Sequence, residues 1–460
     1  MKLKKNISLS ALMVILIASV LVIKALDIKI YNTPKKVIDH DVINFYSYLP
    51  ATFVEKDLTL SFIHNDFNHY VCGNYYWPEI VPPDSTFVIK TTMGLSMLYC
   101  PFFLMAHLTA KPLGYPADGF SPPYAAALVF ACIFWVVLGC VFLRKVLLRR
   151  FSELTTTIVL GVTVLATNLL WYSTYEGAYS HGFLFGLICI FLYQTEQWYR
   201  KPSWWSTITL GLNIGLIALV RPSDALVVVY FLLYGITSWK DFVERLQLYI
   251  HCLPMMLTMA ASAVVIWIPQ IIYWHVLTGH LLFYSYTNNE HFFWTQPKLL
   301  EGIFGFRKGW LIYTPVMVFA ILGLIPLYKR HRHYFYATLV FLVLNLYVLM
   351  CWWCWWYGGC FGQRSMVDCY GLLAVPMAAF VEWMLNRKRI PRIMLLVLFA
   401  AVSYLSFFHY KQYKHEAIHY EAMTFKAYVD SFGHKYHSER FWDLLDWPDY
   451  EAAKQGIRET

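Results

Sequence analysis

The sequence predicts an all-α, polytopic membrane protein with about 11 transmembrane helices and an external helical loop after the first of them. Three observations support this fold class. Hydrophobic residues make up 58% of the chain and charged residues only 14%, against about 25% charged in an average soluble domain. Apolar runs of about 20 residues, the length that crosses a bilayer, recur along the chain. The links between them are alternately rich and poor in Lys and Arg, as the positive-inside rule requires.

We interpret the first apolar run, Ile7–Leu26, as a retained anchor helix. It is too long for the core of a signal peptide, and no small-residue cleavage site follows it. The lysines before Asn6 place its start in the cytoplasm, so residues 27–122 form the first external loop. Thr91–Ala110 within this loop is also apolar. Counting it as a span would move every later Lys/Arg cluster outside, so we expect interfacial or re-entrant helices there.

The later spans alternate in direction and put the dense Lys/Arg clusters in the cytoplasm. They are Tyr124–Leu143, Leu154–Thr174, Phe183–Trp198, Ile208–Val220, Ala225–Trp239, Leu253–Val276, Trp310–Tyr328, Phe335–Trp353, Tyr370–Leu385 and Ile393–Phe408. Residues 1–409 then form one transmembrane domain, and residues 410–460 form a short external C-terminal tail.

Several function classes are disfavoured by the sequence. It has no P-loop, no GxGxxG and no HExxH, which argues against a nucleotide-driven pump or a zincin. The net charge of +9 comes from short basic clusters between apolar runs and does not indicate nucleic acid as a partner. Cys351 and Cys354 form a CxxC without a second pair, and we interpret them as two apolar thiols at a span end rather than a zinc site or a disulfide.

Unusual polar residues gather at the external ends of the predicted spans. Ionisable groups at membrane depth are costly and are functional candidates for that reason. Cations there can hold a phosphate leaving group, and a carboxylate can remove a proton from an attacking hydroxyl. These residues are Asp39, Asp41, Lys90, Glu176, His181, Arg221, Asp224, Glu290, His291, Arg307, Lys308 and Arg364.

The stretch DHDVINFYSYLP, which opens the first external loop, holds two of the carboxylates, Asp39 and Asp41, beside a group of aromatic residues. In the functional interpretation one of them is a catalytic base and the other a helper or a metal ligand. The alternative is an ordinary loop start or a helix N-cap before the aromatic run.

Four cations are candidates for a phosphate site. Lys90 precedes an apolar helix, where it can contact a phosphate at the helix start or simply snorkel to the interface. Arg221 faces outward against the positive-inside tendency, which favours anion binding. Arg307, in FGFRKGW, can grip a phosphate or merely end a loop. Arg364 lies in CWWCWWYGGCFGQRSMVD, where an interfacial aromatic belt explains the tryptophans but not the Gly-Gly-x-x-Gly-x-Arg pattern.

Four further residues are candidates for substrate positioning. Glu176 and His181 flank the turn YEGAYSH, which is otherwise an ordinary polar hairpin. Tyr46 and Tyr357 belong to the two aromatic stretches just described and offer rings and hydroxyls to a ligand.

The set of motifs resembles the GT-C superfamily of membrane glycosyltransferases, which includes protein mannosyltransferases and aminoarabinose transferases. WWYGGCFGQRSMVD is similar to the WWGGxxxGPRxL signature, and DHDVINFYSYLPATF resembles the first-loop pattern of bacterial members. KTTMGLSMLYCPFFLMAH, TNLLWYSTYEGAYSHGFLF and LIALVRPSD resemble further segments in the same order. The resemblance covers roughly residues 7–390.

The resemblance implies a first-loop acid as the base, which falls on Asp41, with Asp39 in reserve. It also implies polyprenyl-phosphate sugars as donors, inversion at the anomeric carbon, and donor-phosphate contacts by Lys90, Arg221, Arg307 and Arg364. The chain departs from the pattern at Gln363, where proline is usual, and at the valine that follows Asp41.

The sequence therefore predicts a glycosyltransferase of the bacterial inner membrane that moves a sugar from a polyprenyl-phosphate donor to an external glycan, lipid or protein. The N-terminus would be cytoplasmic and the active site external. The alternatives are a lipid-linked glycan polymerase or ligase, and a transporter of lipid-linked glycan without chemistry. No cofactor is called for with certainty, although Asp39, Asp41 and Glu176 can bind one divalent metal ion or none.

Overall fold

The computed structural model describes residues 7–61, 63, 78–81, 86–286 and 290–457. The molecule is 70% helical. Its only strands in the described part are β1 (Glu79–Val81) and β2 (Thr86–Val88), an antiparallel hairpin within the first loop that pairs Glu79 with Val88. The lysines at the N-terminus and parts of the first loop lie outside the described residues.

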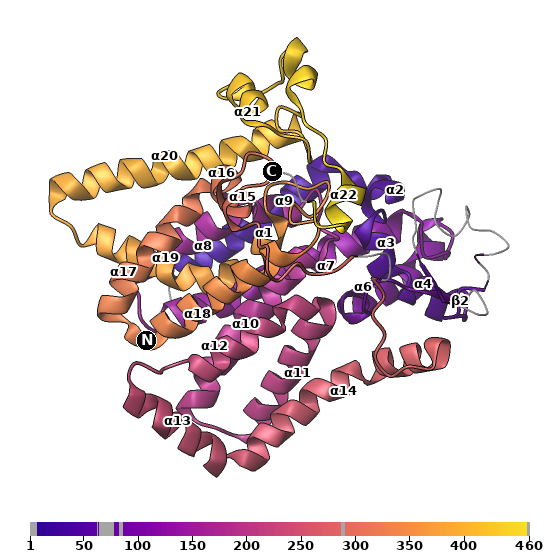
Figure 1. The fold of residues 1–460 in the computed structure, drawn as a ribbon, viewed down its shortest axis with the longest axis horizontal. Helices are drawn as coiled ribbons and strands as arrows, with labels where there is room; N and C mark the ends of the chain where they lie inside the picture. The colour runs from indigo at the N-terminus through magenta and orange to yellow at the C-terminus, as the bar shows by residue number, and fades with distance from the viewer. Residues whose placement is uncertain (1–6, 62, 64–77, 82–85, 287–289, 458–460) are drawn as a thin grey trace, which may run out of the picture.

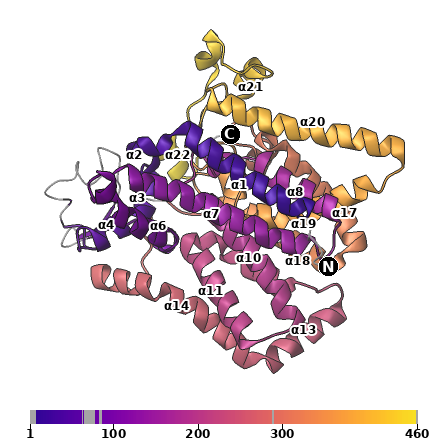
Figure 2. The same cartoon turned by 180° about the vertical axis from the view of Figure 1, so that it is seen from behind.

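Every predicted span contains at least one helix, and further helices lie between the spans. Figures 1 and 2 show their arrangement. The helices are α1 (Leu9–Ile28), α2 (Pro34–Val37), α3 (Asp41–Tyr46), α4 (Tyr48–Phe53), α6 (Gly94–Ala110), α7 (Pro122–Leu147), α8 (Glu153–Leu165), α9 (Leu169–Tyr172), α10 (Ser180–Arg200), α11 (Trp204–Val220), α12 (Val227–Leu233), α13 (Trp239–His251), α14 (Leu253–Thr278), α15 (Leu299–Phe304), α16 (Trp310–Tyr313), α17 (Val318–Arg330), α18 (Arg332–Cys351), α19 (Tyr370–Leu385), α20 (Arg389–Lys414), α21 (Phe425–Ser431) and α22 (Tyr450–Lys454).

Many of these helices are apolar enough for a membrane. Among the described residues, five are long and apolar enough to cross one: those that begin at Leu9, Pro122, Leu253, Arg332 and Arg389. Shorter apolar helices cover Glu153–Leu165, Trp204–Val220, Pro222–Leu233 and Tyr370–Leu385. The coarse prediction of a helical membrane protein is therefore confirmed, whereas the count of 11 spans stays a prediction.

Three predicted spans are interrupted. Leu154–Thr174 divides into α8 and α9, and Trp310–Tyr328 divides into α16 and α17 around Pro315. The span predicted over Ala225–Trp239 ends early, because α12 stops at Leu233. Gly235 then adopts a φ of +84°, a backbone conformation that few other residues tolerate, and its N–H donates to the carbonyl of His333.

Polar contacts mark the two ends of the bundle. Arg149 forms an ion pair with Glu196 near the end of α10, and Tyr334 donates a hydrogen bond to the same carboxylate. His181 lies at the opposite end of α10, where the candidate residues gather. A helix of 21 residues rises on the order of 30 Å, which is the thickness of the bilayer hydrocarbon. The Arg149–Glu196 pair thus lies near one end of α10, and the candidate site forms at the other.

Helix α6 stays at the end of the bundle that carries the candidate residues. Near its start, Thr92 donates to the carbonyl of Leu219, which lies near the end of α11. Near its end, His107 Nδ1 lies 2.7 Å from the hydroxyl of Tyr124 at the beginning of α7. Figure 1 shows α6 beside α3 and α4. The interfacial or re-entrant placement of Thr91–Ala110 stays a prediction.

Helices α11 and α14 pack against each other through glycines. A Cβ on Gly215 would lie 2.4 Å from the carbonyl oxygen of Ala263, and one on Gly211 would lie 2.3 Å from that of Met259. The spacing of four residues between the glycines is the small-residue pattern that lets membrane helices approach closely. The pair holds α14, which is otherwise largely exposed, against the rest of the molecule.

Gly215→Ala is predicted to lower stability, because its methyl group would push against the backbone of α14 rather than against a movable side chain. We expect a loss of about 1–3 kcal/mol, the usual range for overpacking, measured as a lower thermal unfolding midpoint in detergent. Gly161→Ala is the matched control, since its nearest neighbour is the flexible end of Met13. Equal midpoints for the two variants would contradict the close α11–α14 contact.

Candidate functional site

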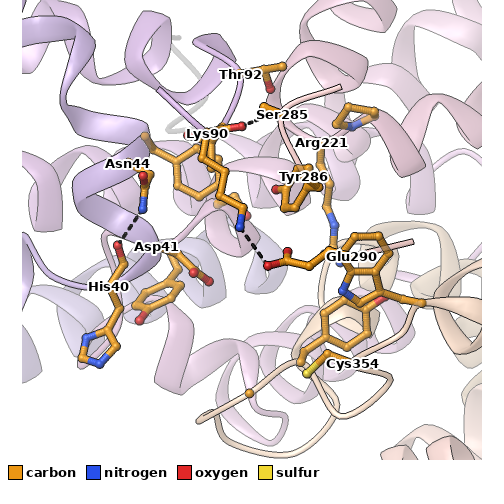
Figure 3. Close-up of a pocket in the computed structure, with 18 of the residues that line it drawn as sticks. His40, Asp41, Asn44, Lys90, Thr92, Arg221, Ser285, Tyr286, Glu290 and Cys354 are labelled. Carbon is orange, nitrogen blue, oxygen red and sulfur yellow. Dashed lines mark hydrogen bonds and ion pairs between the residues drawn. The ribbon is translucent and has the colours of Figure 1, made fainter. Parts of the chain in front are cut away.

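A cavity of about 1990 Å³ opens at the end of the bundle where α3, α10 and α11 meet the long loops (Figure 3). Pockets for small ligands usually measure about 300–1,000 Å³, so this one has room for a larger or an extended ligand. Most of the residues predicted as site residues line it together: Asp39, Asp41, Lys90, Glu176, His181, Arg221, Tyr357 and Arg364.

Asp41 is the first residue of α3, and its side chain meets Arg364 in the cavity. Arg364 Nη2 lies 2.7 Å from Asp41 Oδ2, and the guanidinium also covers the ring of Tyr179. The Asp41 side chain remains 45% exposed, so a ligand can reach it. His40, directly before it, has φ +48° and ψ −123°, a strained conformation for a residue with a side chain. This turn sets the direction in which Asp41 enters the cavity.

The carboxylate of Asp39 interacts with the adjacent residue, His40. One carboxylate oxygen accepts the backbone N–H of His40 at 2.9 Å, and the other lies 3.0 Å from His40 Nδ1. Asp39 therefore stabilises the turn before α3, whereas Asp41 faces a cation from a distant loop.

Lys90 projects into the cavity from the segment before α6. Its Nζ lies 2.9 Å from Glu290 Oε1 and also 5.1 Å from the centre of the Tyr286 ring (Figure 3). Ser285 donates to the backbone carbonyl of Lys90, which joins the loop after α14 to the start of α6. This loop thus brings a carboxylate to Lys90 at the cavity wall.

His181 and Arg221 both contact the carboxylate of Asp368. His181 Nδ1 lies 2.7 Å from Asp368 Oδ1, and Arg221 Nη1 lies 2.8 Å from Asp368 Oδ2. The Asp368 side chain is only 1% exposed. The guanidinium of Arg221 also lies over the ring of Tyr357. Asp368 therefore fixes both cavity-lining side chains from behind.

The glycine-rich turn before α19 adopts the special conformations that its sequence suggested. Tyr357, Gly358 and Gly362 have φ values of +58°, +67° and +58°. A Cβ on Gly362 would lie 3.0 Å from Cβ of Tyr313, so glycine is needed there for space as well. Gln363 donates from Nε2 to the carbonyl of Trp355 at 3.0 Å and closes the turn internally.

Glu176 is the least satisfied carboxylate of the site. Its Oε2 is buried without a hydrogen bond in the described structure. Burial raises the pKa of Glu176, an effect that the positive charge of Arg364 only partly offsets. A carboxyl group of this kind holds its proton at a pH where an exposed glutamate is ionised.

Arg307 and Tyr46 do not reach the cavity. Arg307 Nη2 binds Asp446 Oδ2 at 3.0 Å, and its Nη1 donates to the Asp446 and Glu421 carbonyls. Tyr46 is fully buried and donates to the carbonyl of Gly119. The prediction that Arg307 contacts a donor phosphate is therefore not supported by its position. Its guanidinium N–H groups donate to Glu421 and Asp446 in the C-terminal tail.

Several residues that complete the cavity were not predicted as site residues. Asp368 and Glu290 are the partners of predicted site residues. Each stood in an unusual polar stretch, which was a usable signal, but their pairing depends on contacts distant in sequence. The C-terminal tail also lines the cavity, through Tyr420, Glu421, Tyr450 and Lys454, and no sequence pattern indicated this.

Cysteines and metal ligands add two findings. Cys351 and Cys354 are buried and form no disulfide with each other, in agreement with their interpretation as apolar residues. No group of three His, Cys, Asp or Glu side chains in the described residues is arranged to share a metal ion. The divalent ion that the carboxylates of the site would permit stays a prediction.

No protein-family model matches this chain, and a search of curated proteins gives no significant match.

Glu176→Gln is predicted to change how stability depends on pH. Because folding raises the pKa of Glu176 above its ordinary value of 4.5, the unfolded chain releases this proton first as the pH rises. The wild-type protein therefore loses stability from about pH 4.5 upward until the raised pKa is passed. The glutamine variant lacks this loss, and its thermal unfolding midpoint should fall less between pH 4 and pH 7. Glu55→Gln, which removes an exposed carboxylate, should follow the wild type; parallel curves for all three proteins would contradict the burial of a protonated Glu176.

Proposed function

We propose that this protein is an integral-membrane glycosyltransferase that moves a sugar from a polyprenyl-phosphate donor to an external acceptor. The observation that carries the proposal is the pairing of Asp41 with Arg364 in a large cavity that also receives Lys90 and Arg221. A reachable carboxylate beside several cations is what this transfer needs, because one group must take a proton while the others receive a phosphate. The ordered resemblance of the sequence motifs to the GT-C superfamily supports the same activity.

The donor phosphate would bind between Arg364, Arg221 and Lys90. Each of these cations has a carboxylate partner in the structure, namely Asp41, Asp368 and Glu290. A phosphate that enters the cavity would compete with Glu290 for Lys90 and with Asp41 for Arg364. Asp368 is buried behind Arg221 and would keep the guanidinium in place during this exchange.

In the transfer step the acceptor hydroxyl oxygen attacks the anomeric carbon of the sugar. Its proton passes to a carboxylate oxygen of Asp41, and the bond between the anomeric carbon and the phosphate oxygen breaks. The polyprenyl phosphate leaves with the electron pair of that bond, and the cations stabilise its added negative charge. Attack from the face opposite the phosphate inverts the anomeric centre. Release of Asp41 from Arg364 by the phosphate would leave this carboxylate able to take the proton.

The distribution of polar groups favours an enzyme over a transporter. A transporter of lipid-linked glycan would carry its binding site near the middle of the membrane, between two related halves. Here the candidate residues gather at one end of the bundle, beside the loops. The proposal places this end on the periplasmic face of a bacterial inner membrane, with the N-terminus in the cytoplasm. A polymerase or ligase of lipid-linked glycan would share the same chemistry with a longer acceptor.

Asp41→Asn is predicted to reduce sugar transfer roughly 10²–10⁴-fold, the usual contribution of a general base. The measurement is transfer from a panel of radiolabelled polyprenyl-phosphate sugars by the purified protein in lipid nanodiscs. Asp39→Asn is the matched control and should keep most of the activity, because Asp39 is engaged by His40.

Size-exclusion profiles and unfolding midpoints establish that both variants are folded. A folded Asp41→Asn protein with wild-type transfer would remove Asp41 from the mechanism. A selective loss in Asp39→Asn would move the role of base to Asp39.

A further inference from the structure

The C-terminal tail is a folded part of the molecule. Ala417, Ala422 and Phe441 are completely buried. The helices α21 and α22 have side-chain caps, in which Thr424 accepts the N–H of Ala427 and Asp449 accepts that of Ala452. Figures 1 and 2 show α22 at the same end of the molecule as α2 and α3, away from the chain that projects around α21.

Two adjacent cations fasten this tail to the loops of the site. Arg307 binds the carboxylate and the carbonyl of Asp446, at 3.0 and 2.8 Å. Lys308 is buried, and its Nζ donates to the carbonyls of Cys360 and Tyr420. The backbone N–H of Cys360 also donates to the carbonyl of Tyr420, at 3.0 Å. The tail is thus joined to the glycine-rich turn that carries Arg364.

The tail contributes aromatic and charged side chains to the lining of the cavity. Tyr420 lies so close to Gly359 that a Cβ there would be 3.0 Å from its ring, and Tyr450 packs edge-on against Trp353 with ring centres 6.0 Å apart. The Tyr450 hydroxyl donates to Glu421 Oε2 at 2.6 Å. We refer to Tyr420, Glu421, Tyr450 and Lys454 as the tail wall.

The chemistry of the tail wall differs from that of the cations at Asp41. Its carboxylate would repel a donor phosphate, and the charge of Lys454 is already compensated by Glu451 at 2.9 Å. Aromatic rings accept the C–H faces of a sugar, while a carboxylate and a phenol bind its hydroxyls. Glu421 Oε1 has no hydrogen bond within the described residues, so it can accept one from a ligand.

We propose that the tail wall binds the acceptor and that the acceptor is a carbohydrate. This inference rests on the proposed glycosyltransferase function and adds the class of the second substrate. It also gives Arg307 and Lys308 a role, because they hold the tail wall against the turn of Arg364.

The test separates acceptor binding from donor chemistry. The full-length protein in nanodiscs is given the polyprenyl-phosphate sugar panel, with a series of octyl glycosides as acceptor probes. Transfer to the glycoside and release of sugar to water are measured separately. For Glu421→Gln and Tyr450→Phe we expect the KM for the octyl glycoside to rise about tenfold or more, as the loss of a hydrogen bond to a charged group predicts. Release of sugar to water should stay at the wild-type rate. Asp443→Asn, an exposed carboxylate of the tail outside the wall, should change neither rate.

Three results would overturn the inference, and they are distinguishable. If both variants keep the wild-type KM for the glycoside, the tail wall does not bind the acceptor. If the wild type releases sugar to water but uses no octyl glycoside, the acceptor is not a carbohydrate, although the donor chemistry stands. If the wild type turns over no donor at all, the proposed function fails and the inference fails with it. Tyr450→Phe keeps the packed ring, so a folded variant is expected even if Glu421→Gln is unstable.

Discussion

Much of the site depends on the buried carboxylate of Asp368. It is contacted by His181 at the start of α10 and by Arg221 at the end of α11. Charges in an apolar bundle are tolerated only when they are paired, and removing one partner of such a pair is strongly destabilising. The short 3₁₀ segment Arg364–Met366 places Arg364 four residues before Asp368, where it turns toward Asp41. One tight turn therefore joins the network behind the cavity to the carboxylate within it.

The positions of the long apolar helices could be predicted from the sequence because their signal is local. Apolar runs bounded by basic clusters mark where each helix lies, and the structure follows them at α1, α7, α18 and α20. The interruptions were missed because they depend on single backbone conformations, such as the positive φ of Gly235. Asp41 and Arg364 were identified separately from their motifs, but their contact joins positions 323 residues apart. The turn of Arg307 toward Asp446 spans 139 residues, and no pattern near Arg307 indicated it.

The cavity combines surfaces that suit an amphipathic substrate. Its polar side carries the ion pairs, while Trp267 and Trp274 of α14 and Leu282 and Phe283 of the following loop add apolar lining. Helix α14 is itself largely exposed and apolar, as expected for a helix that faces lipid. A polyprenyl-phosphate donor likewise has a polar part, the charged phosphate, and an apolar part, the long hydrocarbon chain. The proposed binding of the donor would exchange carboxylates for phosphate around Lys90 and Arg364.

The most direct test of the proposed transfer follows the phosphorus atom of the donor. The wild-type protein in nanodiscs is incubated with each polyprenyl-phosphate sugar and observed by ³¹P NMR. Cleavage between the anomeric carbon and the phosphate oxygen converts the phosphodiester resonance into that of a phosphomonoester, and we expect this for at least one donor sugar. An unchanged phosphodiester across the whole panel, with acceptor glycan and divalent metal supplied, would contradict a glycosyltransferase that uses such donors.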